Sequence, residues 1–495
     1  MTDTTIDPAS PLPAPSTPPG TGDDAGGPRT IKRYTTRQVL RSAWRILVAV
    51  KDGLALLFLL LFFAILAGVL TARPNPAQPT GDGALVLRLN GFISEQPAPV
   101  DPFAAFSGGK APVEYRAGDL VRALGAAATD ARVKLVVLDL DNFHGAGQVS
   151  LGEVGAALDA VRAARKPVLA YATAYSDDGY QLAAHASEIW TQQGGGVMVA
   201  GPGGSRLYYK GLMDKLGVQA HIYRVGTFKS AVEPYLRADQ SPEAAQAARA
   251  YMGVMWNQWL AQVKRARPAA RIDAYIADPV AAMRAANNDV TAASKAAGLI
   301  DKIGTRLEFD RYVGTLAGTR DENRPWAYNR IKLNDWIAAN PAPTTGERIA
   351  IVPIVGNIVD GRADSGTAGG DSIAAHILDA VADEDVKAIV VRVDSRGGSV
   401  TASERIRSAL MEAKRVRHLP IVISMGNVAA SGGYWVSTPA DRIFAQPDTI
   451  TGSIGVFGVL PSFERALGSI GVTTDGEKTT ALSGQPDVFA GTNAE

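Results

Sequence analysis

The sequence predicts an α/β protein in which two tandem parallel-sheet domains follow a single membrane-spanning helix. The chain of 495 residues is long enough for two to four domains with cores of their own. One order of strand and helix patterns occurs twice, and one long uncharged apolar run lies near the N-terminus. The predicted divisions are a disordered tail (1–30), a basic juxtamembrane segment (31–53), a transmembrane helix (54–70), a first repeat (83–235), a helical connecting region (236–340) and a second repeat (348–495).

The N-terminal segments predict a membrane anchor and its orientation. The tail is rich in Pro, Ser, Thr and Gly and has too few apolar groups to offset the entropy of ordering. The apolar run from Leu54 to Leu70 is at the short end of a bilayer span. Basic residues crowd the segment before it and only Arg73 follows closely, so the positive-inside rule places the N-terminus in the cytoplasm. A cleaved signal peptide is the alternative, although the run exceeds the usual ~7–15 residue core and no clear Ala-x-Ala site follows.

Composition excludes several classes of function. Fifty basic residues stand against 49 acidic ones, so no global field favours nucleic acid and we expect no nucleic-acid partner. The chain has no cysteine, which excludes disulfides, thiol catalysis and cysteine-ligated zinc.

The internal repeat predicts two copies of one parallel-sheet unit. "VKLVVLDLDNF" at 133–143 and "VKAIVVRVDSR" at 386–396 are continuous apolar strand patterns, typical of strands buried in a parallel sheet. Each is preceded by a leading strand (84–93 or 349–359) and followed by a glycine-containing loop, a helical pattern and a further strand. The right-handed crossover rule winds such units into parallel α/β domains.

The rest of the chain connects and ends these copies. Residues 236–335 are mostly helical in pattern and open on a Ser-Pro-Glu start signal, and "NPAPTTGE" at 340–347 predicts a linker. The second copy stops soon after the counterpart of residue 229, so we expect it to be truncated.

Chemistry is expected where the two copies differ. Aligning "SDDGYQLAAHASEIW" with "AASGGYWVSTPADRIF" places Asp177 opposite Ser431, and the same offset places Val199 opposite Ser453. Further along the alignment it is the first copy that carries the reactive side chain, since Lys229 aligns with Ser483 of the second copy. One half therefore carries serines and the other carries a lysine.

A lysine can activate a serine only if its amine is neutral near pH 7, which requires burial or nearby cations. No histidine lies near Ser431, because the histidines stand at 144, 185, 221, 376 and 418. Lys229 has apolar neighbours in Val225, Phe228 and Val232. The alternative is an ordinary solvated lysine paired with Glu233 at i+4.

Acyl transfer through a serine also needs backbone amides that face the developing oxyanion. Gly432 follows Ser431 directly, and Gly397 or Gly398 follows the end of a predicted strand, where open α/β sheets place their sites. Either glycine pair is alternatively a tight turn without catalytic use.

Four motifs in this order resemble the signal peptide peptidase A family of membrane-anchored serine-lysine peptidases, in its long duplicated form. They are "VGTFKSAVEPY", "DSRGGSVTASERIR", "MGNVAASGGYWVSTPADRIFA" and "TGSIGVFG". The resemblance implies a ClpP/crotonase-like fold for each repeat and an endopeptidase that degrades hydrophobic peptides such as remnant signal peptides. It implies Ser431 as the nucleophile, Lys229 as the general base and Ser453 as the residue that orients the lysine, with an oxyanion hole at Gly432, Gly397 and Gly398.

The same resemblance implies the setting of the enzyme. No metal or cofactor is expected, and the partners are hydrophobic peptides, the lipid bilayer and further copies of the chain in a homo-oligomer, a tetramer. The expected location is the bacterial inner membrane, with both repeats on the periplasmic side.

One departure from the family pattern bears on function. The family usually has Ser-Pro-Gly-Gly where this chain has Ser395-Arg396-Gly397-Gly398, and arginine does not fix φ as proline does. A catalytically impaired scaffold that binds hydrophobic peptides is therefore the alternative function. A crotonase-like acyl-CoA enzyme is disfavoured, because CoA is cytoplasmic and such enzymes need no serine nucleophile.

Overall fold

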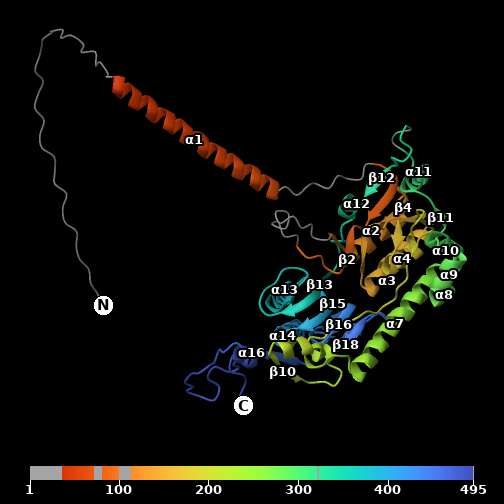
Figure 1. The fold of residues 1–495 in the computed structure, drawn as a ribbon. Helices are drawn as coiled ribbons and strands as arrows, with labels where there is room; N and C mark the ends of the chain where they lie inside the picture. Colours follow the sequence, from red (N-terminus) through yellow and green to blue (C-terminus); the bar gives the residue numbers. More distant parts are fainter. Residues whose placement is uncertain (1–35, 72–80, 100–112, 320, 322, 494–495) are drawn as a thin grey trace, which may run out of the picture. The chain divides into compact units, whose positions relative to one another are not determined.

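The computed structural model describes residues 36–71, 81–99, 113–319, 321 and 323–493 (Figure 1). The predicted tail at 1–30 lies outside these residues. The chain divides into two compact units, Met1–Asn75 and Pro76–Glu495, and each is described by itself.

The first unit contains one long helix, α1 (Thr36–Thr71). Among the described residues it is the one helix long and apolar enough to cross a membrane, through the stretch Ala43–Gly68. The helix begins well before the predicted start at Leu54, because the basic segment ahead of the apolar run has no proline and is rich in good helix formers.

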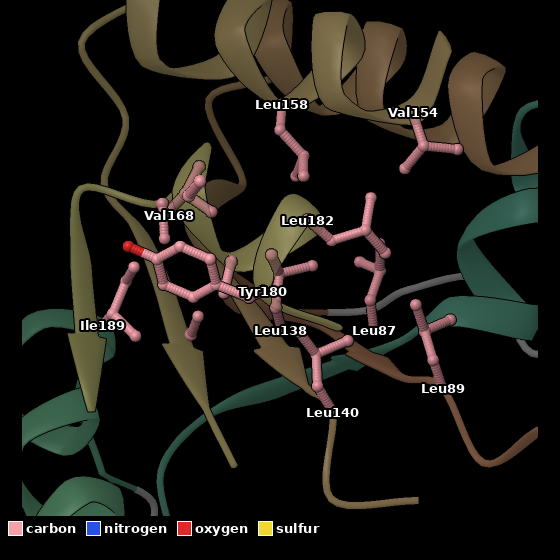
Figure 2. Close-up of a cluster of buried hydrophobic side chains, with 14 of the residues drawn as sticks. Leu87, Leu89, Leu138, Leu140, Val154, Leu158, Val168, Tyr180, Leu182 and Ile189 are labelled. Carbon is pink, nitrogen blue, oxygen red and sulfur yellow. The ribbon is translucent and has the colours of Figure 1, made fainter. Parts of the chain in front are cut away.

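In the second unit, the first copy forms a six-stranded sheet with the order β11-β8-β6-β4-β1-β12, and its neighbouring strands are all parallel. Figure 2 shows how Leu158 of α3 faces Leu138 of β4 and Val168 of β6 in the core. The sheet's elements are β1 (Gly83–Arg88), β4 (Val133–Asp139), β6 (Val168–Tyr171), β8 (Glu188–Thr191), β11 (Lys302–Ile303), β12 (Arg330–Lys332), α2 (Ala117–Thr129), α3 (Gln148–Ala163) and α4 (Asp177–Ala184).

The predicted connecting region is part of this first fold. Its strands β11 and β12 form the two edges of the first sheet, and its helix α7 supplies Trp259 and Val263 to the same core. An isolated linker of helices could not bury these apolar faces, so they pack on the nearest sheet. The helices are α7 (Pro242–Ala266), α8 (Ile272–Ala277), α9 (Pro279–Ala285), α10 (Val290–Ala296), α11 (Arg306–Ala317) and α12 (Leu333–Ala339).

Small sheets complete the first copy. The predicted strand at 84–93 divides after Arg88, and its second part pairs in a three-stranded parallel sheet with the order β3-β2-β5. Gly91 allows this division, since its φ of +146° and its approach to the Val113 carbonyl leave no room for a side chain. The elements are β2 (Gly91–Ser94), β3 (Val113–Arg116), β5 (Phe143–Ala146), β7 (Ala174–Tyr175) and β9 (Gly196–Val197).

The second copy forms a sheet with the order β14-β13-β15-β16-β17, and β18 pairs with the end of β16. All these pairs are parallel. Helices α13 and α14 contribute Ile377, Ile406 and Leu410 to a core of its own. The elements are β13 (Arg348–Val359), β14 (Ala368–Gly369), α13 (Gly370–Ala382), β15 (Val386–Gly398), α14 (Val400–Arg417), β16 (Ile421–Ala430), α15 (Gly432–Trp435), β17 (Arg442–Phe444), β18 (Ile450–Gly452) and α16 (Glu464–Ser469). The predicted fold class, tandem parallel-sheet α/β copies after one apolar helix, is confirmed.

A small sheet joins the copies. Strand β10 (Gln219–Arg224) of the first copy pairs antiparallel with β19 (Phe457–Ser462) of the second. His221 adds a side-chain hydrogen bond of 2.9 Å to Ser462 across this ladder. Between β10 and α7 lie η1 (Ser230–Val232) and α6 (Glu233–Leu236), and α5 (Lys210–Lys215) precedes β10.

Candidate active site

Ser431 lies at the carboxyl end of strand β16, on the turn that leads into helix α15. Its backbone has φ 51° and ψ −117°, a conformation that non-glycine residues rarely adopt. The amide of Ser431 holds this turn by donating to the Gly452 carbonyl at 2.8 Å. The neighbouring strand β15 ends beside it, because Ser395 pairs in register with Ala429. The predicted turns of Ser431 and Gly397 therefore meet at the carboxyl ends of two neighbouring strands of the second sheet.

Lys229 of the first copy lies next to these two turns. It follows β10, and the cross-copy pairing continues past that strand through a bond of 2.9 Å from the Val225 amide to the Val456 carbonyl. Gly226, with φ +108°, then turns the chain close to the Ile454 carbonyl. The lysine side chain ends up buried, with 6% of its surface exposed.

The structure brings three predicted residues together, because Ser431 and Ser453 both contact the amine of Lys229. Lys229 Nζ lies 3.1 Å from Ser431 Oγ, although the two residues are 202 positions apart. The same Nζ lies 3.1 Å from Ser453 Oγ and donates to the Ser453 carbonyl at 2.7 Å. Ser453 also has an unusual positive φ, 49°, which presents both of its oxygens to the amine.

The surroundings of Lys229 favour the neutral amine. Desolvation by burial lowers the pKa of the Lys229 ammonium below its ordinary value. The alternative pairing with Glu233 is wrong, because that carboxylate accepts from the amide and the hydroxyl of Ser241 instead.

Of the three apolar neighbours predicted for Lys229, only one is buried. Val232 is fully buried, whereas Val225 and Phe228 are 66% and 56% exposed. The contacts at the amine come instead from Ser431 and Ser453 of the other copy. Local sequence could not show this, since the enclosing residues are more than 200 positions away.

The three predicted oxyanion glycines lie side by side. A Cβ on Gly397 would stand 2.5 Å from the Gly432 nitrogen, and one on Gly432 would stand 3.3 Å from the Gly398 nitrogen. Gly397 and Gly398 have φ of +91° and +157°. The Gly397 amide donates to Ser395 Oγ at 3.1 Å, and that hydroxyl donates to the Gly356 carbonyl at 2.6 Å. Ser395 thus fixes this turn without a proline. The Gly397 amide donates its hydrogen bond inside the turn.

A cavity of about 900 Å³ opens over these groups. Its walls are mostly apolar and come from both copies, which is the usual character of a ligand site. These wall residues lie in the four motifs, but the sequence did not predict that they enclose one cavity, because their approach depends on the pairing of β10 with β19. The apolar and aromatic wall residues are Val225, Ala231, Val400, Tyr434, Trp435, Ile454, Val456 and Phe457.

Asn427, which the sequence analysis did not single out, connects the active-site strand to the first copy. Its Oδ1 accepts from the amides of Val149 and Ser150 at the start of α3, at 3.0 and 3.2 Å. Its Nδ2 donates to Asp394 Oδ2 at 2.8 Å and to Ser150 Oγ at 3.2 Å. Asp394 in turn accepts from the Val428 amide at 2.8 Å, so strands β15 and β16 are tied together just before the turns of Gly397 and Ser431.

The corresponding turn of the first copy is occupied by its own side chains. Asp177, at the position of Ser431, accepts from the amides of Ala200 and Gly201 at 3.1 Å. Asp178 accepts from the Ala146 amide, also at 3.1 Å. Carboxylates and their backbone partners therefore occupy this turn, and the first copy has no serine at the position of Ser431.

The described residues contain no group of three or more His, Cys, Asp or Glu side chains arranged to hold a metal ion.

Comparison with known proteins identifies similar sequences. Residues 160–315 and 413–487 match peptidase family S49. The chain is 36% identical over 463 residues to Protease 4 of Haemophilus influenzae, covering 90% of this chain and 74% of that one. It is 38% identical over 468 residues to Protease 4 of Salmonella typhi, covering 92% and 74%. Serine protease SPPA of Arabidopsis thaliana, a chloroplast protein, is 27% identical over 67% of this chain and 48% of its own.

Proposed function

This chain belongs to peptidase family S49 and is a serine-type peptidase, and on that premise we propose that it cuts hydrophobic peptides with a Ser431–Lys229 dyad. The observation that carries the proposal is the 3.1 Å separation of Lys229 Nζ from Ser431 Oγ. Each residue comes from the copy that lacks the other, so the dyad forms only when the copies pack together.

The proposed mechanism follows from the geometry. The neutral Lys229 amine takes the proton of Ser431, whose Oγ attacks the peptide carbonyl. The same lysine then returns the proton to the leaving amine, and a water activated by the lysine hydrolyses the acyl-enzyme. Ser453 holds the amine in place through both of its oxygens. No metal or cofactor takes part in these steps.

We assign the oxyanion donors to the amides of Gly432 and Gly398. These glycines lie beside each other at the nucleophile. Gly397, predicted as a third contributor, has its amide on Ser395 Oγ, so its role is to bring the turn close to Gly432. Two fixed amides at a developing negative charge stabilise a tetrahedral intermediate.

The substrate class is inferred from the cavity and from the family resemblance. Apolar and aromatic walls favour hydrophobic segments, including the signal peptides that remain after secretion. Helix α1 supports a membrane anchor, which would keep the site near such peptides. The resemblance also supports a homo-oligomer, a tetramer, which light scattering of the detergent-solubilised protein would measure against the chain mass of 51.9 kDa.

The dyad is tested with the full-length protein in detergent and quenched apolar peptides. Ser431→Ala and Lys229→Ala should each lower kcat/KM by more than about a thousandfold. Lys478→Ala, at an exposed lysine outside the cavity, is the matched control and should cut normally. A fluorophosphonate should label the native protein and not Ser431→Ala. Native protein that is neither labelled nor active would instead support a peptide-binding scaffold.

The proposed orientation is tested separately. It places the N-terminus in the cytoplasm and both repeats on the periplasmic side of the inner membrane. The chain has no cysteine, so Gly476→Cys at an exposed site introduces a single thiol. A membrane-impermeant maleimide should label it in spheroplasts. Labelling that requires permeabilisation of the inner membrane would reverse the orientation.

A further inference from the structure

One arginine that lines the substrate cavity has no part in the mechanism above. Arg396 is exposed and lines the cavity, directly before Gly397. Gly397 is close to the nucleophile, since a Cβ placed on it would lie 2.9 Å from Ser431 Cβ. The backbone of Arg396 is therefore one residue from the catalytic turn.

The other arginine of the cavity is already neutralised. Arg407 forms two hydrogen bonds of 2.8 Å with the Glu404 carboxylate. That carboxylate also accepts from Trp435 Nε1 at 2.9 Å. Arg407 is thus engaged with a partner that belongs to the protein. Within the described part of the chain, no such hydrogen bond or ion pair is found for the Arg396 guanidinium.

The charges on the cavity wall are unbalanced. No residue lining the cavity, all of them described, carries a carboxylate, and its basic side chains are those of Lys229, Arg396 and Arg407. Catalysis requires Lys229 to be neutral, and Glu404 compensates Arg407. Arg396 is then the one uncompensated charge on the wall of a mostly apolar cavity, where an opposite charge on the ligand gains more than it would in water.

We propose that Arg396 recognises a carboxylate on the substrate, close to the bond that is cut. The inference rests on the proposed peptidase function and narrows its substrate class to apolar peptides with one acidic group beside the scissile bond. A planar guanidinium binds a carboxylate through two parallel hydrogen bonds, which would also fix the position of the peptide. The carboxylate can belong to an Asp or Glu side chain or to the free C-terminus of a short peptide.

The test compares matched substrates on the full-length protein in detergent. One series of quenched apolar peptides carries a single Asp at successive positions, and a partner series carries Asn there. A further pair differs only in a free or amidated C-terminus. The ratio of kcat/KM within each pair isolates the charge and cancels differences in the amount of active enzyme.

The native protein should prefer the acidic peptide about fivefold at one position or at the free C-terminus, as an ion pair in a partly solvated site would give. Arg396→Gln should bring that ratio to about one, whereas Arg396→Lys, which keeps the charge but not the two parallel hydrogen bonds, should keep part of it. The matched control Arg249→Gln, at an exposed arginine of α7 outside the cavity, should leave the ratio unchanged. Added salt should lower the ratio.

Two results would overturn the inference: equal cleavage of every acidic and neutral pair by the native protein, or a preference that persists in Arg396→Gln. Both results leave the neutral peptides cleaved. A failure of the proposed peptidase function is distinguishable, since neither series would then be cut and Ser431 would not react with a fluorophosphonate.

Discussion

Lys229 can take a proton from Ser431 only while its own amine is neutral. Because burial lowers the pKa of Lys229, the neutral fraction rises at a lower pH than it would for an exposed lysine. We expect kcat/KM to increase with pH through this lowered pKa and then to level off. A pH–rate profile on a neutral apolar peptide measures it.

The substitution Lys229→Arg sharpens this prediction. A guanidinium at this position would keep the positive charge and the burial but could not lose its proton, so the variant should be inactive across the whole pH range. Lys478→Arg, at an exposed lysine, is the control and should keep the native profile. A flat profile in the native protein, or clear activity in Lys229→Arg, would contradict the role of general base.

Gly397 determines how closely its own turn approaches the turn of Ser431 and Gly432. Its φ of +91° is strained for any other residue, and a Cβ there would lie 2.5 Å from the Gly432 nitrogen. Gly397→Ala should therefore displace the oxyanion amide and lower kcat by about 10²–10³-fold. The measurement is steady-state cleavage beside a thermal melt.

Gly476→Ala is the matched control for Gly397→Ala, because a Cβ at Gly476 meets nothing within 4 Å. Native kcat in Gly397→Ala would show that the Gly432 amide is not needed for the reaction. If Gly397→Ala failed to fold, Gly432→Ala would test the same turn, since its Cβ would come 2.5 Å from Ser403 Oγ and 3.3 Å from the Gly398 nitrogen.

Among the secondary-structure elements, β16 and α3 are coupled through Asn427. Asn427→Ala would leave the Val149 and Ser150 amides without their acceptor and remove a donor to Asp394. Losing partners for buried polar groups costs about 1–3 kcal/mol of unfolding free energy. We expect a lower melting temperature together with a loss of kcat, because Ser431 follows on the same strand.

Asn142→Ala serves as the control for Asn427→Ala. Its amide is exposed and makes a 3.4 Å hydrogen bond to Asn90, so both stability and activity should stay near native. If Asn427→Ala behaved in the same way, the bridge between the copies would not position the active-site strand.

For the whole molecule, the pairing of β10 with β19 decides whether the dyad forms. Ile222 and Val459 face each other in this ladder. Since the native chain has no cysteine, Ile222→Cys combined with Val459→Cys introduces one defined pair. Mild oxidation should close an intramolecular disulfide and preserve peptidase activity, as the crosslink fixes a pairing that is already present.

Non-reducing electrophoresis and peptide mass mapping would detect this crosslink. Either cysteine alone is the control and should give no intramolecular product. A crosslink that forms only between chains would show that the strand partner comes from a second copy. Loss of activity on oxidation, restored by reduction, would show that the active arrangement differs from this pairing.

Much of the architecture was predictable because it depends on short-range patterns. The buried strands at 133–139 and 386–398 contain the apolar runs 135–138 and 388–391, and the helices after them bury one face. The connecting region was assigned less well. Strands β11 and β12 are only two and three residues long, too short to leave a pattern, and they are strands because the first sheet has edges to pair.

The sequence alone determined the chemistry that is available: a serine on a bare glycine turn in one copy and a lysine in the other, each missing from its counterpart. The tertiary structure decided whether these groups meet, which wall residues surround them and which charges remain unpaired. The physical reason is that burial and contact between positions 202 residues apart depend on the packing of both copies. The burial that lowers the pKa of Lys229, the bridge at Asn427 and the place of Arg396 in the cavity wall, where it has no partner among the described residues, all depend on that packing.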